Sequence, residues 1–280
     1  MELGLKDKVV LITGGTRGIG ADIARGFAEE GARVAICART KADLDARSAE
    51  IAKATGAPVI GVPVDLSRRG EPERLVEHVV SRFGRLDVLV NSAGVAPGGN
   101  IEELTDDDWE RGIQLKLLGL VRCTRAAIPV MRRQGGGRVV NVVGNDGVKC
   151  AYWEIVPAIC CAAELIFTAT LAEEYGPEGI YVNAVNPGPV ETGLMRGLFE
   201  QVAKRRGLSV EEVLDAHVES IPLKLRRIAQ PREVTDVVLF LASDRASFVN
   251  GVSVNVDGGQ MKPVLARQVY GSAGRRAARG

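Results

Sequence analysis

The sequence predicts a single α/β domain with a doubly wound, seven-stranded parallel sheet and helices on both faces. Seven short apolar runs recur along the chain, and amphipathic stretches of helical length separate most of them. No internal repeat and no linker rich in Pro, Gly or Ser divides the chain. Strands and helices that alternate in this way form right-handed crossovers, which produce a parallel sheet. The expected strands are 8–13, 33–38, 59–64, 86–90, 138–143, 180–185 and 252–256.

The helices follow from the spacing of their apolar residues. Ile19, Ile23 and Phe27 lie on one face of a helix that Gly31 ends. Leu75, Val79 and Phe83 show the same spacing before Gly84. A second helix is therefore expected there, as the alternation of strands and helices requires.

Two segments depart from this alternation. Residues 193–230 have helical patterns without a strand, which suits a flap over a substrate site. Residues 263–280 are rich in Arg, Ala and Gly and show no periodicity, so a basic mobile tail is expected there. The folded domain should therefore cover residues 1–262.

Composition excludes several classes of partner. Thirty-six basic and 35 acidic residues leave a net charge of +1, so no overall field favours nucleic acid. No apolar run approaches the roughly 20 residues that a membrane span needs, and residues 1–8 are too polar for a signal peptide. The five cysteines are odd in number and lack metal-ligand spacing. We therefore expect reduced thiols, no metal and a cytoplasmic location.

A glycine-rich turn after the first strand indicates a phosphate site. The strand runs into the sequence TGGTRGIG at 13–20, and a helix follows. Glycines let a pyrophosphate approach the backbone, and the free N–H groups of a helix N-terminus face it. The spacing is G-x-x-x-G-x-G, and a tight turn without a ligand is the alternative interpretation. The residues expected to contact the cofactor here are Gly14, Thr16, Arg17, Gly18, Ile19 and Gly20.

The end of the second strand favours NADP(H) over NAD. An NAD site usually places an acidic residue here for the ribose hydroxyls, whereas an arginine favours the 2′-phosphate. This chain has Ala38 followed by Arg39, and Arg17 could share the phosphate. The alternative is that both arginines are simply exposed at helix starts.

Four further motifs follow in order. They are Asp65-Leu66 after the third strand, Asn91-Ser92-Ala93-Gly94 after the fourth, Asn186-Pro187-Gly188 after the sixth, and Val256-Asp257-Gly258-Gly259 at the last. With the glycine-rich turn, they make the chain resemble the short-chain dehydrogenase/reductase superfamily, with its Rossmann-type fold, from about residue 5 to 262. Several motifs in the right order are far more specific than any one of them.

The resemblance implies roles for these residues. Asp65 would hold the adenine amine with Leu66 packed beside it, while Asn91, Ser92, Ala93 and Gly94 would line the ribose. The nicotinamide carboxamide would be held by Pro187, Gly188, Val190 and Thr192. The family also forms homodimers or homotetramers through two long helices, which here would cover 106–133 and 158–175.

The usual catalytic residues of this family do not follow. The family uses an Asn, Ser, Tyr, Lys tetrad in which Tyr and Lys are spaced as YxxxK and Tyr acts as general acid or base. In this chain the Ser position falls on Gly144, the Tyr position on Pro157 and the Lys position on Cys161. The Asn position falls on Lys116. All four roles are therefore altered at once.

Three functions remain open on this evidence. The first is a carbonyl or alcohol oxidoreductase with relocated groups, drawn from Lys116, Asn145, Asp146 and Tyr152. The second is a lyase or isomerase on the same scaffold, and the third is a cofactor-binding regulatory protein without redox chemistry. The substrate would be a small molecule, but the mixture of apolar and basic residues in the flap ranks no class above another.

Each candidate catalytic residue also has an ordinary interpretation. Lys116 could be a lysine that extends to the surface from an apolar helix. Asp146 could hydrogen-bond its own backbone in an Asn-Asp-Gly turn, and Tyr152 could be a packing residue. Our hypothesis is that Lys116 supplies the positive charge that Cys161 cannot, and that burial lowers the pKa of its ammonium toward neutrality.

Overall fold

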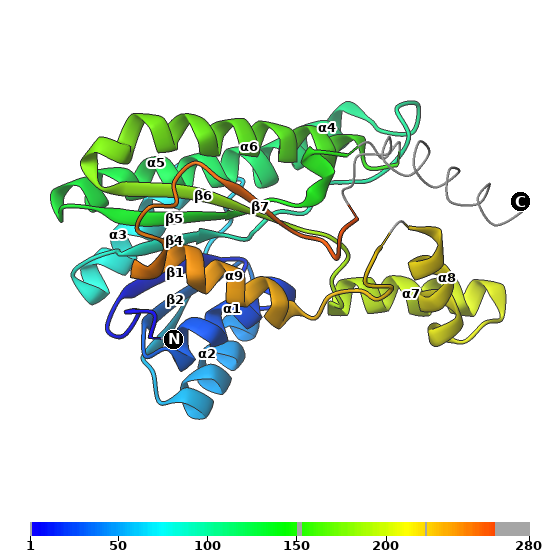
Figure 1. The fold of residues 1–280 in the computed structure, drawn as a ribbon, viewed down its shortest axis with the longest axis horizontal. Coiled ribbons are helices and arrows are strands. Elements are labelled where there is room, and N and C mark those ends of the chain that lie inside the picture. The colour runs from blue at the N-terminus through cyan, green and yellow to red at the C-terminus, as the bar shows by residue number, and fades with distance from the viewer. Residues whose placement is uncertain (1, 150–152, 222, 261–280) are drawn as a thin grey trace, which may run out of the picture.

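The structure is a computed structural model and describes residues 2–149, 153–221 and 223–260. In this part of the chain seven parallel strands form one sheet with the order β3-β2-β1-β4-β5-β6-β7 (Figure 1). The direction of the winding reverses between β1 and β4. In open sheets of this kind, ligands bind where that reversal occurs, at the carboxyl ends of the strands.

All seven predicted strands are confirmed, with ends within two residues of those expected. They are β1 (Val9–Thr13), β2 (Arg33–Ala38), β3 (Val59–Pro63), β4 (Val88–Asn91), β5 (Gly137–Val142), β6 (Ile180–Pro187) and β7 (Ser253–Val256). For the inner strands burial explains the agreement, because strands covered on both faces consist of near-continuous Val and Ile runs. β1, β4 and the middle of β2 are buried at every position.

The helices alternate with the strands as expected. The α-helices are α1 (Gly18–Glu29), α2 (Lys41–Thr55), α3 (Glu71–Phe83), α4 (Asp106–Gly112), α5 (Leu118–Arg133), α6 (Ile155–Tyr175), α7 (Gly193–Arg206), α8 (Val210–Ser220) and α9 (Pro231–Ala242). Shorter segments are η1 (Ile113–Leu117), η2 (Asn145–Gly147), η3 (Gly176–Glu178) and η4 (Asp244–Ala246). The segment expected to form a flap has α7 and α8, and Figure 1 shows both beyond the edge of the sheet. The predicted tail at 263–280 lies outside the described residues.

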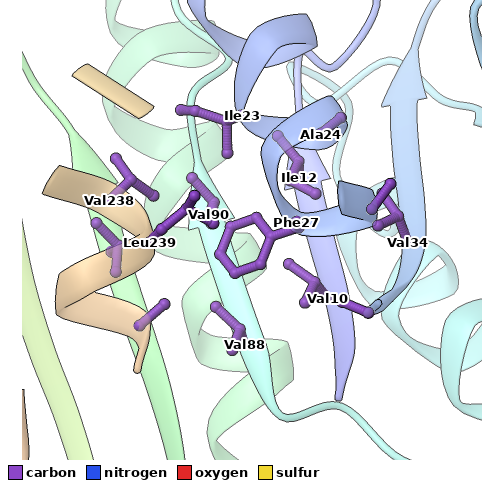
Figure 2. Packing of buried hydrophobic residues seen from close by; sticks show 14 of the residues in the cluster. Val10, Ile12, Ile23, Ala24, Phe27, Val34, Val88, Val90, Val238 and Leu239 are labelled. Carbon is purple, nitrogen blue, oxygen red and sulfur yellow. The ribbon is translucent and has the colours of Figure 1, made fainter. Parts of the chain in front are cut away.

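Helices cover both faces of the sheet and form two apolar cores. Helices α1, α2 and α9 cover one face, and α3, α5 and α6 cover the other (Figure 1). Phe27 of α1 is fully buried between strands and α9, with Val10, Val88 and Leu239 around its ring (Figure 2). Truncating such a side chain to alanine costs about 3–5 kcal/mol.

A buried polar network connects the second core to the site. Asn91 Nδ2 donates to Asn141 Oδ1 at 2.9 Å and to Thr124 Oγ1 at 3.0 Å. Asn141 Nδ2 then donates to Thr168 Oγ1 at 2.9 Å. These bonds link β4, β5, α5 and α6, so the helices that flank the site are held in register with the strand ends.

The α6 helix corrects one expectation from the sequence. Ile155–Glu178 is long and apolar enough to cross a membrane by length and composition alone. The sequence interpretation missed it because the acidic residue Glu164 interrupts the run. A core helix of a folded domain meets the same requirement, and α6 buries one stripe, including Val156, Cys160 and Leu171, within the fold.

Candidate active site

A cleft of about 1390 Å³ follows the carboxyl edge of the sheet. It is lined by residues that come after each of the strands β1 to β6, together with residues of α7 such as Leu194 and Leu198. Small-molecule pockets usually measure roughly 300–1,000 Å³. This cleft therefore has room for a dinucleotide and a substrate together.

The glycine-rich turn has the shape that a pyrophosphate needs. Gly14 and Gly18 have positive φ angles of 70° and 56°, which side chains rarely adopt. A Cβ at Gly20 would lie 2.5 Å from the carbonyl oxygen of Gly14, and one at Gly15 would lie 2.5 Å from Ile36. Only glycines allow this turn to lie so close to α1, so the N-terminus of that helix faces the cleft directly.

Thr13 fastens the next loop to this turn. Its Oγ1 accepts hydrogen bonds of 3.0 Å from the backbone N–H groups of both Ser92 and Ala93. A Cβ at Gly14 would lie 3.0 Å from Cα of Ala93, so the two loops touch. The cofactor residues predicted after β1 and β4 therefore share one wall of the cleft.

The adenosine end of the cleft is basic. Arg39 is exposed there. The pKa of Asp65 is lowered mainly by the side-chain hydrogen bond from Ser67, and the charge of Arg39 lowers it further. Arg17 lies 2.8 Å from the carboxylate of Asp43 and is thus already paired. Among these groups, Arg39 is the cation best placed to meet a phosphate.

Sequence reasoning missed Arg47 in this wall. Its Nε donates to the carbonyl oxygen of Thr16 at 3.1 Å, which supports the glycine-rich turn from below. The available signal was the spacing of Asp43 and Arg47, which places both on one face of α2. That face points at the turn, and both residues line the cleft.

Most of the predicted cofactor residues line the cleft, and two do not. Gly14, Thr16, Arg17, Gly18, Ile19, Gly20, Arg39, Asp65, Leu66, Ser92, Ala93, Gly94, Pro187, Gly188 and Thr192 line it. Asn91 instead places its side chain in the buried polar network beneath the wall. Val190 is buried in the first core, and its backbone pairs with that of Ala229. The side chains of these two residues therefore lie in the interior and support the residues that line the cleft.

Lys116 is buried at the centre of the cleft wall, on the π-helical segment η1. Its Nζ donates to the carbonyl oxygen of Val143 at 3.0 Å and lies 3.4 Å from Oε2 of Glu164. The thiol of Cys161 donates to the same carbonyl oxygen at 3.2 Å. The ammonium of Lys116 thus occupies the space beside Cys161. Insertions of a π turn are frequent at functional sites because they redirect a side chain.

The expected direction of the Lys116 pKa was wrong. Burial is the largest influence and lowers the pKa, but Glu164 and Cys161 together outweigh it and raise the pKa above its ordinary value. The ammonium therefore stays charged at neutral pH. The prediction failed because Glu164 is 48 residues from Lys116 in the chain, and the sequence does not show that the fold brings the two together.

Glu164 is the second residue that sequence reasoning missed. It is almost fully buried on α6, and burial raises the pKa of its carboxyl to about 7, although Lys116 opposes this. An acidic residue in the middle of an apolar helix was the available signal, because carboxylates are rarely buried without a partner. The pair can therefore change its net charge near neutral pH.

The other predicted catalytic residues have different surroundings. Asn145 is buried and its Nδ2 donates to Gln260 Oε1 at 2.5 Å, so it fastens η2 to the residues after β7. Asp146 lines the cleft and lies 2.9 Å from Nζ of Lys149. Tyr152 lies outside the described residues. The structure thus brings Lys116 and Asp146 to the cleft and gives Asn145 a structural contact.

One position assigned by the resemblance has a physical obstacle to the usual side chain, and another holds a buried thiol. Gly144 has a φ of 120°, so a serine there would be strained. Cys161 is buried, and burial raises the pKa of its thiol to about 11, so the thiol stays protonated at neutral pH. Among the described residues, the cleft is lined by no tyrosine.

Comparison with known proteins identifies the family. The family model described as enoyl-(acyl carrier protein) reductase matches residues 14–261. The chain is 36% identical over 257 residues to an uncharacterised oxidoreductase of Thermotoga maritima, covering 92% of this chain and 98% of that protein. It is 35% identical to 3-oxoacyl-[acyl-carrier-protein] reductase FabG of the same organism, covering 91% and 98%. The chain belongs to the short-chain dehydrogenase/reductase superfamily of oxidoreductases.

A solved structure of this superfamily agrees with the fold. L-sorbose reductase from Gluconobacter frateurii, complexed with NADPH and L-sorbose, superposes with a TM-score of 0.91 and is 32% identical. The match covers 94% of this short-chain dehydrogenase/reductase and 100% of the sorbose reductase chain. The two chains therefore share this fold over nearly their whole length.

Proposed function

We propose that this short-chain dehydrogenase/reductase is an NADP(H)-dependent oxidoreductase for a carbonyl or alcohol substrate, with acid–base groups that differ from the usual tetrad. The observation that supports this most directly is the position of Lys116. Its ammonium lies in the cleft wall beside Cys161, the residue that the resemblance assigns to the family's lysine position. On that assignment, a positive charge is retained where the family has its lysine.

The choice of NADP(H) rests on the adenosine end of the cleft. Arg39 is exposed beside Asp65, whereas the nearby carboxylate of Asp43 is neutralised by Arg17. A guanidinium with free donors recognises phosphate oxygens in a bidentate manner. The presence of NADPH in the related sorbose reductase is consistent with this choice.

When bound, the nicotinamide would supply or accept the hydride at the substrate carbon. The glycine-rich turn would hold the pyrophosphate, and Gly188 and Thr192 would face the carboxamide end of the cleft. Lys116 would orient the nicotinamide ribose with a fixed charge and donate hydrogen bonds. On the substrate side, Leu194 and Leu198 of α7 are exposed and could cover an apolar substrate and exclude water.

Cofactor choice can be tested by titrating NADPH and NADH separately against the wild type and Arg39→Ala. We expect the wild type to prefer NADPH, and we expect Arg39→Ala to weaken NADPH binding about 10- to 100-fold, since a hydrogen bond to a charged group contributes about 1.5–3 kcal/mol. NADH affinity should change little. Arg205→Ala, an exposed arginine of α7 outside the cleft lining, is the control. Equal affinity for both cofactors in the wild type would contradict the NADP(H) assignment.

The reaction class can be tested by incubating the protein with NADPH and a broad panel of ketones and aldehydes. Oxidation of NADPH that depends on a carbonyl substrate supports the proposal. Substrate turnover without a net change in cofactor absorbance would indicate a lyase or isomerase. Cofactor binding without any turnover would indicate a regulatory protein.

A further inference from the structure

The helix α7 lines one part of the cleft, and two of its large apolar side chains are exposed there. Leu194 and Leu198 lie one helical turn apart, and 76% and 57% of their surface is exposed. Val95, from the loop after β4, lines the same cleft and is 65% exposed. Exposed apolar side chains that gather in a cleft indicate a surface for an apolar ligand.

The two leucines are not needed to hold α7 in place. The helix packs through other residues, since Phe199 and Ala203 are buried with Val213 of α8 in a small apolar cluster separate from the two cores of the domain. A surface helix that already buries one apolar stripe is expected to be polar on its remaining surface. The second apolar stripe, Leu194 and Leu198, is therefore explained better by a ligand in the cleft than by the packing of the helix.

Gly193 and Gly197 keep the space beside this stripe open. Both line the cleft, and apart from the adjacent helix backbone a Cβ built on either would meet no atom within 4 Å. Gly197 is inside α7, where glycine is less favourable than alanine. Its backbone is helical and does not have a positive φ, so the conformation does not require glycine. The absence of a side chain at Gly197 therefore provides volume in the cleft.

The polar side chains near this stripe already have partners within the protein. Thr192 caps the N-terminus of α7 with its side-chain oxygen, and Asp146 lies 2.9 Å from Nζ of Lys149. The ammonium of Lys116 donates within the cleft wall. On α7 itself, Gln201 is the polar residue that lines the cleft beside the two leucines. A substrate with several hydroxyl groups would lose hydrogen bonds to water here that few side chains could replace.

We propose that the substrate carries a bulky apolar group beside its carbonyl or carbinol carbon, and that this group binds against Val95, Leu194 and Leu198 in the space that Gly197 leaves open. This inference rests on the proposed function and adds the class of substrate to it. Gly197 is then a specificity-determining residue, because a larger side chain at this position would occupy the space of the apolar group.

The test uses three ketones as probes. Butanone is small, cyclohexylacetone carries a bulky apolar group, and erythrulose is an open-chain ketose with hydroxyl groups. The kcat/KM for NADPH-dependent reduction of each is measured with the wild type and with Gly197→Leu. Butanone and cyclohexylacetone react with the same NADPH complex, so a change in cofactor affinity cancels in the ratio of their kcat/KM values. Arg205→Leu places the same side chain at an exposed position of α7 outside the cleft lining and is the control.

We expect the wild type to prefer cyclohexylacetone over butanone by about tenfold or more, since each buried methylene group contributes roughly a fourfold gain. It should also prefer cyclohexylacetone over erythrulose. In Gly197→Leu the ratio of cyclohexylacetone to butanone should fall about tenfold or more, because the leucine fills the space of several methylene groups. Arg205→Leu should keep the ratio of the wild type. The Tm of Gly197→Leu should be no lower than that of the wild type, because the side chain enters open space and leucine favours the helix.

Two results overturn the proposal. One is that the wild type reduces erythrulose as well as cyclohexylacetone, and the other is that the ratio in Gly197→Leu stays within about threefold of the wild type. Should Gly197→Leu fail to fold, the double variant Leu194→Gln, Leu198→Gln decides. Its preference for cyclohexylacetone over erythrulose should fall about tenfold, and an unchanged preference overturns the proposal.

Failure of the proposed function gives a different result. Saturation-transfer NMR measures the binding of cyclohexylacetone without any turnover. A wild type that binds cyclohexylacetone but reduces no carbonyl compound, together with loss of this binding in Gly197→Leu, contradicts the proposed function and supports the apolar site. Reduction of ketones without a preference for cyclohexylacetone contradicts only the apolar site.

Discussion

At the scale of single residues, the proposed chemistry depends on the buried charge of Lys116. Replacing it in Lys116→Met keeps length and apolar bulk but removes the ammonium that donates to Val143 and pairs with Glu164. We expect weaker NADPH binding, loss of turnover and a changed pH–rate profile. Titration of NADPH and steady-state kinetics measure these effects, with the exposed Lys204→Met as control. Affinity and rate within about twofold of the wild type, roughly 0.4 kcal/mol, would mean that Lys116 has no role in the reaction.

The raised pKa of Glu164 predicts how the free energy of unfolding depends on pH. Its pKa is raised to about 7 in the folded protein, mainly by burial. A carboxyl whose pKa is higher in the folded state favours folding most below its unfolded pKa, and this advantage is lost as the pH rises through about 7. Relative to Glu164→Gln, the free energy of unfolding of the wild type should therefore fall by roughly 3 kcal/mol between pH 4.5 and 7. Urea unfolding at several pH values measures this, and a difference that does not change with pH would contradict it.

At the scale of elements, the central feature is the position of a lysine, which this chain has on η1 and the family has on the helix that corresponds to α6. Family resemblance places an asparagine on the first element and a lysine on the second, whereas this chain has Lys116 and Cys161. Cys161→Lys should lower stability because two ammonium groups would then compete for Val143 and Glu164.

Adding Lys116→Asn to Cys161→Lys should restore much of that loss. A double-mutant cycle on thermal or urea unfolding measures the coupling, which we expect in the range of about 0.5–3 kcal/mol for residues in contact. Additive effects of the two substitutions would show that they do not share one site. A second double-mutant cycle that combines Cys123→Ala with Lys116→Asn is the control, because these two residues have different environments.

The elements also show what sequence could and could not predict. The inner strands β1, β2 and β4 were found because burial on both faces leaves a continuous apolar signal, and the glycine-rich turn was found because close backbone contact excludes side chains. Glu164 and Arg47 were missed because their importance comes from residues distant in the chain, Lys116 and Thr16. Spacing within one helix places a residue on a face but does not say which charge the fold brings to it.

At the scale of the whole molecule, we propose a homodimer or homotetramer assembled through α5 and α6. Ile159 and Ile166 lie two turns apart on α6 and are 49% and 70% exposed, which is unusual for large apolar residues of a core helix. Ile166→Glu should reduce the mass measured by light scattering after gel filtration. Leu208→Glu, an exposed leucine between α7 and α8, should not. A monomeric wild type would contradict the proposal.

We propose that this protein transfers a hydride between NADP(H) and a carbon atom although its proton donor is not the usual tyrosine. The most direct measurement is a single-turnover reaction with NADPH deuterated at the transferable position of the nicotinamide and a panel of carbonyl compounds. Mass spectrometry should find one deuterium on the carbinol carbon of the product and one equivalent of NADP⁺, and Lys116→Met should slow the transfer. Protein saturated with labelled NADPH that releases no deuterium to any carbonyl compound would contradict the claim.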